Sequence, residues 1–126
     1  MEEKKKVVYI SGPITGVKEY WTPFEEAEDE LTALGYVPLS PARLPEGMTK
    51  EQYMRICFAM EDSADAVLML PNWTQSDGAQ LEAKYAEYIG KPVVLWKTAD
   101  AYRVNTYPKE VTIAWLKRDL KEAIGE

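Results

Sequence analysis

At residues 66–89 the sequence reads AVLMLPNWTQSDGAQLEAKYAEYI, which contains the clearest succession of strand and helix patterns in the chain. It opens with the apolar run 66–70, crosses a polar loop at 71–77 and continues from Gly78 in a helical pattern that Gly90 ends. A short apolar run without alternation is typical of a strand buried on both faces. A buried strand followed by a helix indicates one unit of a parallel α/β sheet.

The same order of strand and helix continues on both sides of this stretch. Strands are predicted at 7–10, 36–39 and 92–96, and helices at 22–34, from Thr49 onward and at 108–124. Two helices open with an apparent capping box, Thr22-Pro23-Phe24-Glu25 and Thr49-Lys50-Glu51-Gln52. The side chains of the second of these helices that are expected to face the core are Tyr53, Ile56, Cys57 and Met60.

Alternating strands and helices over residues 1–126 predict one domain with a small doubly wound parallel sheet, Rossmann-like (flavodoxin-like), of about four to five strands. In such sheets ligands bind outside the carboxyl ends of the strands, where the strand order reverses. We therefore expect the functional site in the loops after the first and third strands.

The amino-acid composition limits which partners and which catalytic groups the protein can have. Lys plus Arg total 15 against 21 Asp plus Glu, a net charge of −6, which argues against a nucleic-acid polymer as partner. The chain has no His and one Cys, so Ser-His and Cys-His nucleophile systems and His metal clusters are excluded. Proton transfer would fall to carboxylates, Lys or Tyr. No apolar run approaches the ~20 residues of a membrane span, and the start MEEKKK lacks the apolar region and cleavage site of a signal peptide. We therefore expect a cytoplasmic protein without membrane, metal or cofactor.

The first candidate loop joins two hydroxyl residues and two glycines directly after a strand. Such a loop suits a backbone cradle for an anion, although a tight strand-to-helix turn would use the same residue types. Its candidate binding residues are Tyr9, Ser11, Gly12, Ile14, Thr15 and Gly16.

The second candidate loop leads into a helix with a carboxylate near its start. Ser76 or Asp77 should cap this helix, Gly78 lets a ligand approach its N–H groups, and Glu82 lies one turn in. A Glu at this place is often only a favourable charge at the helix dipole. Trp73 could stack on a ligand or pack against the sheet.

Two motifs, taken together, resemble a known family. The first is Tyr-x-Ser-Gly-Pro-Ile-Thr-Gly at residues 9–16, and the second is Trp-x-x-Ser-x-Gly-Ala-x-x-Glu at residues 73–82. The chain is similar to the nucleoside 2-deoxyribosyltransferase-like proteins, in particular their small phage and bacterial branch, which is related to the 5′-monophosphate N-glycosidases.

The resemblance implies cleavage of an N-glycosidic bond, with Glu82 as the nucleophile that forms a glycosyl ester. Transferases acting on nucleosides tend to carry Asp where this chain has Ser76, so Ser favours a nucleotide hydrolase, although Asp77 beside it would not help a phosphate. The resemblance also implies a homodimer or homotetramer, for which Trp115 is a plausible contact. Candidates for a second carboxylate are Asp62, Asp65 and Asp77.

Other readings remain open. The hydrolases often carry Arg where this chain has Thr15, and Lys18 is the available substitute. Tyr20 and Trp21 could close over a base or hold the start of the next helix. The chain could also exchange bases as a transferase, bind a nucleotide without catalysis as a sensing domain, or serve as a protein–protein module.

Overall fold

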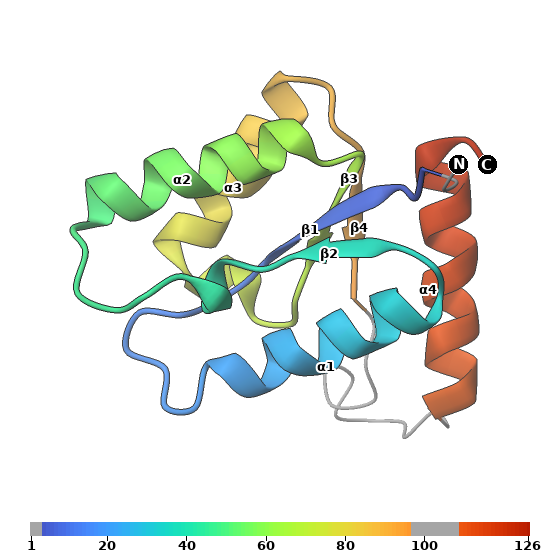
Figure 1. Cartoon of the computed structure of the whole chain (residues 1–126), viewed down its shortest axis with the longest axis horizontal. Helices are drawn as coiled ribbons and strands as arrows, with labels where there is room; N and C mark the ends of the chain where they lie inside the picture. The colour runs from blue at the N-terminus through green and yellow to red at the C-terminus, as the bar shows by residue number, and fades with distance from the viewer. Residues whose placement is uncertain (1–3, 97–108) are drawn as a thin grey trace.

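A parallel sheet flanked by helices on both faces forms the centre of the fold (Figure 1). The computed structural model describes residues 4–96 and 109–126. In chain order the elements are β1 (Val7–Ser11), α1 (Trp21–Ala33), β2 (Val37–Leu39), η1 (Pro41–Arg43), α2 (Lys50–Ser63), β3 (Ala66–Met69), η2 (Trp73–Gln75), α3 (Asp77–Tyr88), β4 (Val93–Leu95) and α4 (Lys109–Ile124). The predicted fold class is confirmed, with element ends shifted by about one residue.

The four strands lie in the order β2-β1-β3-β4, and every neighbouring pair is parallel. The chain first moves from β1 to β2 and then crosses back to β3 on the other side of β1, so the order reverses between β1 and β3. Ser11 at the end of β1 pairs with Met69 at the end of β3. The loops after these two strands therefore begin side by side, as predicted.

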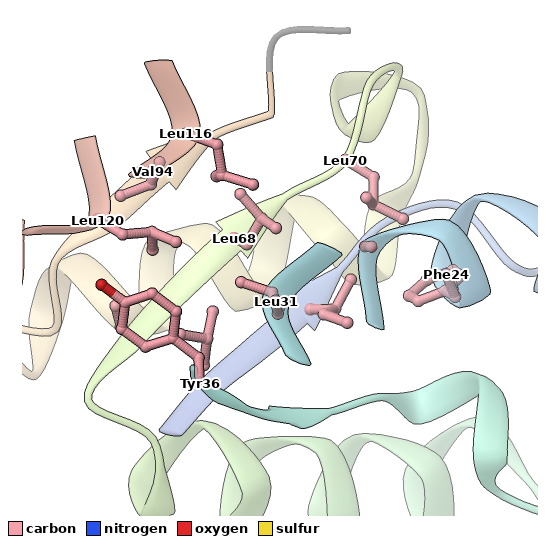
Figure 2. Packing of buried hydrophobic residues seen from close by; sticks show 12 residues of the cluster. Phe24, Leu31, Tyr36, Leu68, Leu70, Val94, Leu116 and Leu120 are labelled. Atoms are coloured by element: carbon pink, nitrogen blue, oxygen red, sulfur yellow. The ribbon is translucent and has the colours of Figure 1, made fainter. Parts of the chain in front are cut away.

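Side chains of each central strand alternate between two cores. Val8 and Ile10 of β1 point into the core beneath α1 and α4, where they meet Phe24, Leu31 and Leu120. Figure 2 shows this core, in which Leu68 of β3 and Val94 of β4 lie with Leu116 of α4. Tyr9, Val67 and Met69 point to the opposite face, into a core beneath α2 and α3.

Of the two predicted capping boxes, the one at the start of α2 forms and the one at the start of α1 does not. At α2 the box forms as predicted: the Thr49 side chain accepts from the Gln52 N–H at 3.1 Å, and the Gln52 side chain accepts from the Thr49 N–H at 2.9 Å. At α1 the prediction was wrong, because Tyr20 occupies the cap position without a side-chain hydrogen bond. The Thr22 N–H donates instead to the Glu19 carbonyl at 3.1 Å, which places Thr22 inside the first turn.

The face of α2 that meets the sheet also differs from the expected one. Ile56 is 37% exposed, whereas Cys57 and Glu61 are buried. The buried face is therefore centred about one position further round the helix, and it includes an acidic residue.

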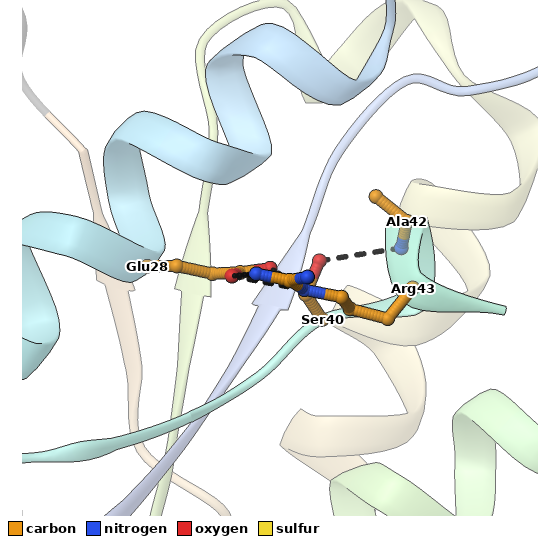
Figure 3. Close-up of polar contacts among 4 residues, drawn as sticks. All are labelled: Glu28, Ser40, Ala42 and Arg43. Carbon is orange, nitrogen blue, oxygen red and sulfur yellow. Dashed lines mark hydrogen bonds and ion pairs between the residues drawn. The ribbon is translucent and has the colours of Figure 1, made fainter.

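The loop after β2 is tied to α1 by an ion pair. The Arg43 guanidinium donates three hydrogen bonds to the Glu28 carboxylate, the shortest from Nη2 to Oε2 at 2.6 Å (Figure 3). The Ser40 hydroxyl, drawn beside the pair, accepts from the Ala42 N–H at 3.2 Å and caps η1. Both contacts fix the chain where it leaves the carboxyl end of β2.

The last helix is present as α4 from Lys109, and Pro108, its predicted first residue, lies outside the described residues. In the described parts of the chain, no helix combines the length and the apolar character that crossing a bilayer requires.

Candidate active site

Glu82 projects from α3 toward the end of β1. It is the sixth residue of a helix that starts at Asp77, and it shares the inward face of that helix with Ala79 and Ala86. Its side chain is 5% exposed, so it does not stand in solvent at the helix start.

Both carboxylate oxygens of Glu82 accept hydrogen bonds from β1. The Tyr9 hydroxyl donates to Oε2 at 2.5 Å, and the Ser11 hydroxyl donates to Oε1 at 2.9 Å. Tyr9 and Ser11 are two residues apart, so the pleat of β1 turns both toward the same face of the sheet. The structure thus brings together three residues that the sequence placed in two separate motifs.

Burial sets the charge state of this group. Desolvation raises the pKa of Glu82 to about 7, and the hydrogen bonds from Tyr9 and Ser11 act in the opposite direction. Burial and the charge on Glu82 raise the pKa of Tyr9, so its hydroxyl stays protonated and remains a donor at neutral pH. A buried carboxylate that titrates near neutral pH is suited to nucleophilic or acid–base chemistry.

The first turn of α3 precedes Glu82 directly in the sequence. Ser76, and not Asp77, caps the helix: its hydroxyl oxygen accepts from the Ala79 N–H at 3.2 Å. Gly78 has neither a positive φ nor a crowded environment, since an added Cβ would meet nothing closer than the Met54 sulfur at 3.8 Å. An added Cβ would therefore make ordinary van der Waals contacts, and local packing does not by itself require glycine at the first turn.

The loop after β1 divides into a packed part and an exposed part. Gly12 is held against Leu70, the residue directly after β3, where an added Cβ would lie 2.9 Å from the Leu70 Cβ. Ile14 packs against the core beneath α1, and its carbonyl accepts from the Val17 N–H at 3.1 Å. Thr15 and Gly16 are exposed at the tip of this turn, and Gly16 has a φ of +75° that favours glycine.

Of the three aspartates predicted as candidates for a second carboxylate, Asp65 and Asp62 accept hydrogen bonds from other residues, and Asp77 is exposed. Asp65 accepts from the Val7 N–H at 2.8 Å and joins the starts of β1 and β3. Asp62 accepts from the Tyr85 hydroxyl at 2.8 Å on the exposed side of α2. Asp77 is exposed in the first turn of α3.

Sequence reasoning missed Glu61, which is fully buried on α2. Neither of its carboxylate oxygens has a hydrogen-bond partner among the described residues. Burial, followed by the charges of Glu82 and Asp62, raises the pKa of Glu61 to about 8. Its spacing from Cys57 and Ala64, four residues on one side and three on the other, was the available signal, because it places Glu61 on an apolar helix face.

The aromatic candidates are held by packing. Trp73 is half-buried and packs against the core beneath α2 and α3. The rings of Tyr20 and Trp21 meet edge to face, with centroids 5.4 Å apart, and the Tyr20 hydroxyl donates to Glu46 at 3.2 Å. Within the described residues, no group of three or more acidic, Cys or His side chains is arranged to hold a metal ion.

Comparison with solved structures places this fold among known proteins. A 2-deoxyribosyltransferase from Bacillus psychrosaccharolyticus is 22% identical, with a TM-score of 0.58 over 71% of this chain and 70% of that one. A 2-desoxiribosyltransferase from Leishmania mexicana is 16% identical, with a TM-score of 0.60 over 90% and 97%. A conserved protein from Enterococcus faecalis V583 is 16% identical, with a TM-score of 0.59 over 97% and 98%.

At these identities the likeness is one of fold, and it agrees with the resemblance seen in the sequence motifs. No curated protein matches the chain in sequence. A family model does match residues 6–95, which include β1, β3, α3 and all three residues of the Tyr9–Ser11–Glu82 cluster. The chain therefore belongs to the family described as a domain of unknown function, DUF4406, and has the fold of the 2-deoxyribosyltransferases.

Proposed function

We propose that the protein cleaves the N-glycosidic bond of a nucleoside or deoxynucleoside 5′-monophosphate through a glycosyl ester on Glu82. The observation that carries this proposal is the buried Glu82 carboxylate, whose two oxygens accept hydrogen bonds from Tyr9 and Ser11. A carboxylate fixed in this way by rigid elements is oriented to attack one carbon of a bound sugar.

The reaction has two steps. In the first, a Glu82 oxygen forms a bond to the anomeric carbon as the bond from that carbon to the base nitrogen breaks, and the electron pair stays with the base, which takes up a proton. In the second, water attacks the anomeric carbon of the ester and loses a proton, which balances the proton that the base took up; the sugar is released and the carboxylate is restored. The two hydroxyl donors hold the carboxylate in place in both steps.

The phosphate is assigned to the start of α3 and the tip of the first loop. The Ser76 oxygen is occupied as an acceptor by the helix, but its hydrogen is free to donate to a ligand. A helix N-terminus favours an anion, and Gly78 carries no side chain that would stand between a ligand and the N–H groups of the first turn. Arg43 is bound to Glu28 and is not needed for this assignment.

Base exchange is the second candidate, favoured by the two structural neighbours that are 2-deoxyribosyltransferases. It uses the same ester, with a free base in place of water in the second step. Incubation with deoxynucleosides and their 5′-monophosphates separates the two: release of base without an acceptor supports the hydrolase, and exchange only with an added base supports the transferase. Binding without either reaction supports a sensing domain.

The role of Glu82 is tested by Glu82→Gln, which keeps the shape of the side chain and removes its nucleophilic charge. We expect the variant to fold and bind ligand while turnover falls by several orders of magnitude, measured as release of free base. A 2-fluoro-2-deoxy nucleotide should leave a sugar-sized mass increment on the parent peptide that contains Glu82.

The control is Glu87→Gln, which changes an exposed carboxylate on the same helix and should leave turnover unchanged. If the Glu82→Gln protein turns over substrate at the parental rate, Glu82 is not the nucleophile.

A further inference from the structure

Cys57 is a buried thiol on α2 beside the Tyr9–Ser11–Glu82 cluster. It is 6% exposed and belongs, together with Tyr9, to the core beneath α2 and α3. Burial raises the pKa of the Cys57 thiol to about 11. At neutral pH the group is therefore a protonated S–H, which is a weak hydrogen-bond donor and not a nucleophile.

The polar neighbours of this thiol come from three elements. From β1, the Tyr9 hydroxyl lies within its hydrogen-bond reach. From α3 the carboxyl of Glu82 acts on it, and from α2 itself the carboxyl of Glu61 does. Both acidic groups raise the pKa of the thiol further, so its proton stays in place while Glu82 is charged.

The contact between Cys57 and Tyr9 has a fixed direction. A tyrosine hydroxyl has one hydrogen to donate, and its oxygen can also accept. The Tyr9 hydrogen is donated to Oε2 of Glu82 at 2.5 Å. The thiol is therefore the donor in its contact with Tyr9, and the Tyr9 oxygen is the acceptor.

This direction places Cys57, Tyr9 and Glu82 in one chain of hydrogen bonds that runs from α2 through β1 to α3. Successive hydrogen bonds polarise one another, so a hydroxyl that accepts a hydrogen bond becomes a stronger donor. Tyr9 is 0% exposed, which keeps bulk water from taking the place of the thiol. Ser11 reaches the other oxygen of Glu82 directly and stands outside this chain.

We propose that Cys57 is a positioning residue for Glu82: its S–H group donates to the Tyr9 oxygen, which aims the Tyr9 hydrogen at Glu82 and stabilises the charged carboxylate. This inference rests on the proposed function, in which the charged form of Glu82 is the nucleophile. Cys57 acts through Tyr9, forms no covalent bond and keeps its proton throughout the reaction.

The first test needs no substrate. In protein labelled with carbon-13 at the glutamate carboxyl carbon, NMR follows the titration of Glu82, which is identified by its absence in Glu82→Gln. Cys57→Ala removes the donor, so the Glu82 midpoint should rise by roughly 0.3–0.5 pH unit. Cys57→Ser keeps a donor and should not raise it. An unchanged midpoint in Cys57→Ala, or an equal rise in Cys57→Ser, overturns the proposal.

The second test asks whether the effect passes through the Tyr9 hydroxyl. Tyr9→Phe removes that hydroxyl, so adding Cys57→Ala to it should cause no further rise of the Glu82 midpoint. The matched control is Ser63→Ala, which removes an exposed hydroxyl from the same helix and should move the midpoint in neither background. If Cys57→Ala raises the midpoint equally with and without the Tyr9 hydroxyl, Cys57 acts by packing alone and the proposal is wrong.

The third test measures the reaction itself. The acid limb of the pH dependence of kcat/KM for base release reports the ionisation of Glu82 in the free enzyme. In Cys57→Ala this limb should move up in pH, so that kcat/KM falls roughly two- to threefold below pH 6 and keeps its plateau value at higher pH. Cys57→Ser should restore the parental limb. A loss of equal size at every pH indicates a structural role and overturns the proposal.

Two further outcomes are distinguishable. If Cys57→Ala does not fold, Cys57→Val removes the donor while filling the space, and the same comparisons are made with it. If the parent protein releases no base from any substrate, the proposed function fails, whereas the substrate-free titrations still decide whether Cys57 acts on Glu82 through Tyr9.

Discussion

Ser76 has two roles that a simple truncation would remove together. Its oxygen caps α3 by accepting from the Ala79 N–H, and its hydrogen is assigned to the ligand phosphate. Ser76→Ala loses the cap as well as the donor, and the cap alone is worth about 1 kcal/mol. A variant that keeps the acceptor for the Ala79 N–H but replaces the donor by a negative charge separates the two roles.

Ser76→Asp is that variant, since Asp caps a helix as well as Ser does. We expect its melting temperature to stay close to the parental value, while affinity for a 5′-monophosphate falls roughly tenfold or more and affinity for the nucleoside is kept. Calorimetry in a Glu82→Gln background measures both without turnover. Equal losses for nucleotide and nucleoside would contradict the phosphate assignment.

The sequence predicted Tyr9, Ser11 and Glu82 as site residues because their two motifs lie at the carboxyl ends of neighbouring strands: the first begins within β1, and the second follows β3 and continues into α3. It did not predict Glu61, because an acidic residue in a helix is normally solvated and the chain offers Asp62 beside it. Which of two adjacent acidic residues is buried depends on the rotation of α2 about its axis. The sequence pattern predicted that Ile56 faces the core, which rotates α2 by about one position from its actual orientation. In the predicted orientation Glu61 does not stand out as a buried residue.

The sequences of α1 and α2 contain the same apparent capping box, but the box forms at α2 and not at α1. Thr49 and Gln52 satisfy each other's backbone N–H groups, whereas Thr22 lies inside the first turn of α1. The difference comes from the preceding chain: Glu19 adopts a φ of 54°, and its carbonyl accepts from the Thr22 N–H, so the helix begins earlier. Such a turn is not specified by the residues of the box itself.

This contrast gives a matched pair of variants. Thr49→Ala should lower the free energy of unfolding by about 1 kcal/mol because a cap is lost. Thr22→Ala should change it by less than about 0.5 kcal/mol, as for an exposed position without a cap. Urea denaturation followed by circular dichroism measures both, and similar losses in the two variants would show that Thr22 caps α1 after all.

The two buried glutamates make the stability of the whole protein depend on pH. Folding raises the pKa of Glu82 to about 7 and that of Glu61 to about 8, both above the unfolded value of 4.5. The folded state therefore binds these protons more tightly than the unfolded state does, so their stabilisation is complete below pH 4.5 and is lost as pH rises through 7 and 8.

We expect the free energy of unfolding to fall by several kcal/mol between pH 5 and pH 8.5, at up to about 1.4 kcal/mol per pH unit for each group. Glu61→Gln should flatten this dependence and make the protein more stable than the parent at pH 8.5, while Glu87→Gln should follow the parental curve. Urea denaturation at a series of pH values measures the slope. If the free energy of unfolding of the parent protein rises over this pH range, Glu61 and Glu82 do not both have raised pKa values in the folded state.

The alternation of side chains along β1 limits where the chain can gain or lose a residue without loss of the site. Tyr9 and Ser11 serve Glu82 on one face of the strand, while Val8 and Ile10 fill the core on the other. Inserting or deleting a single residue within β1 would exchange the faces, so that the donors and the core contacts would be lost in one event. Changes of chain length should therefore be tolerated between η1 and α2, at residues 45–48, and be absent from β1 in functional relatives.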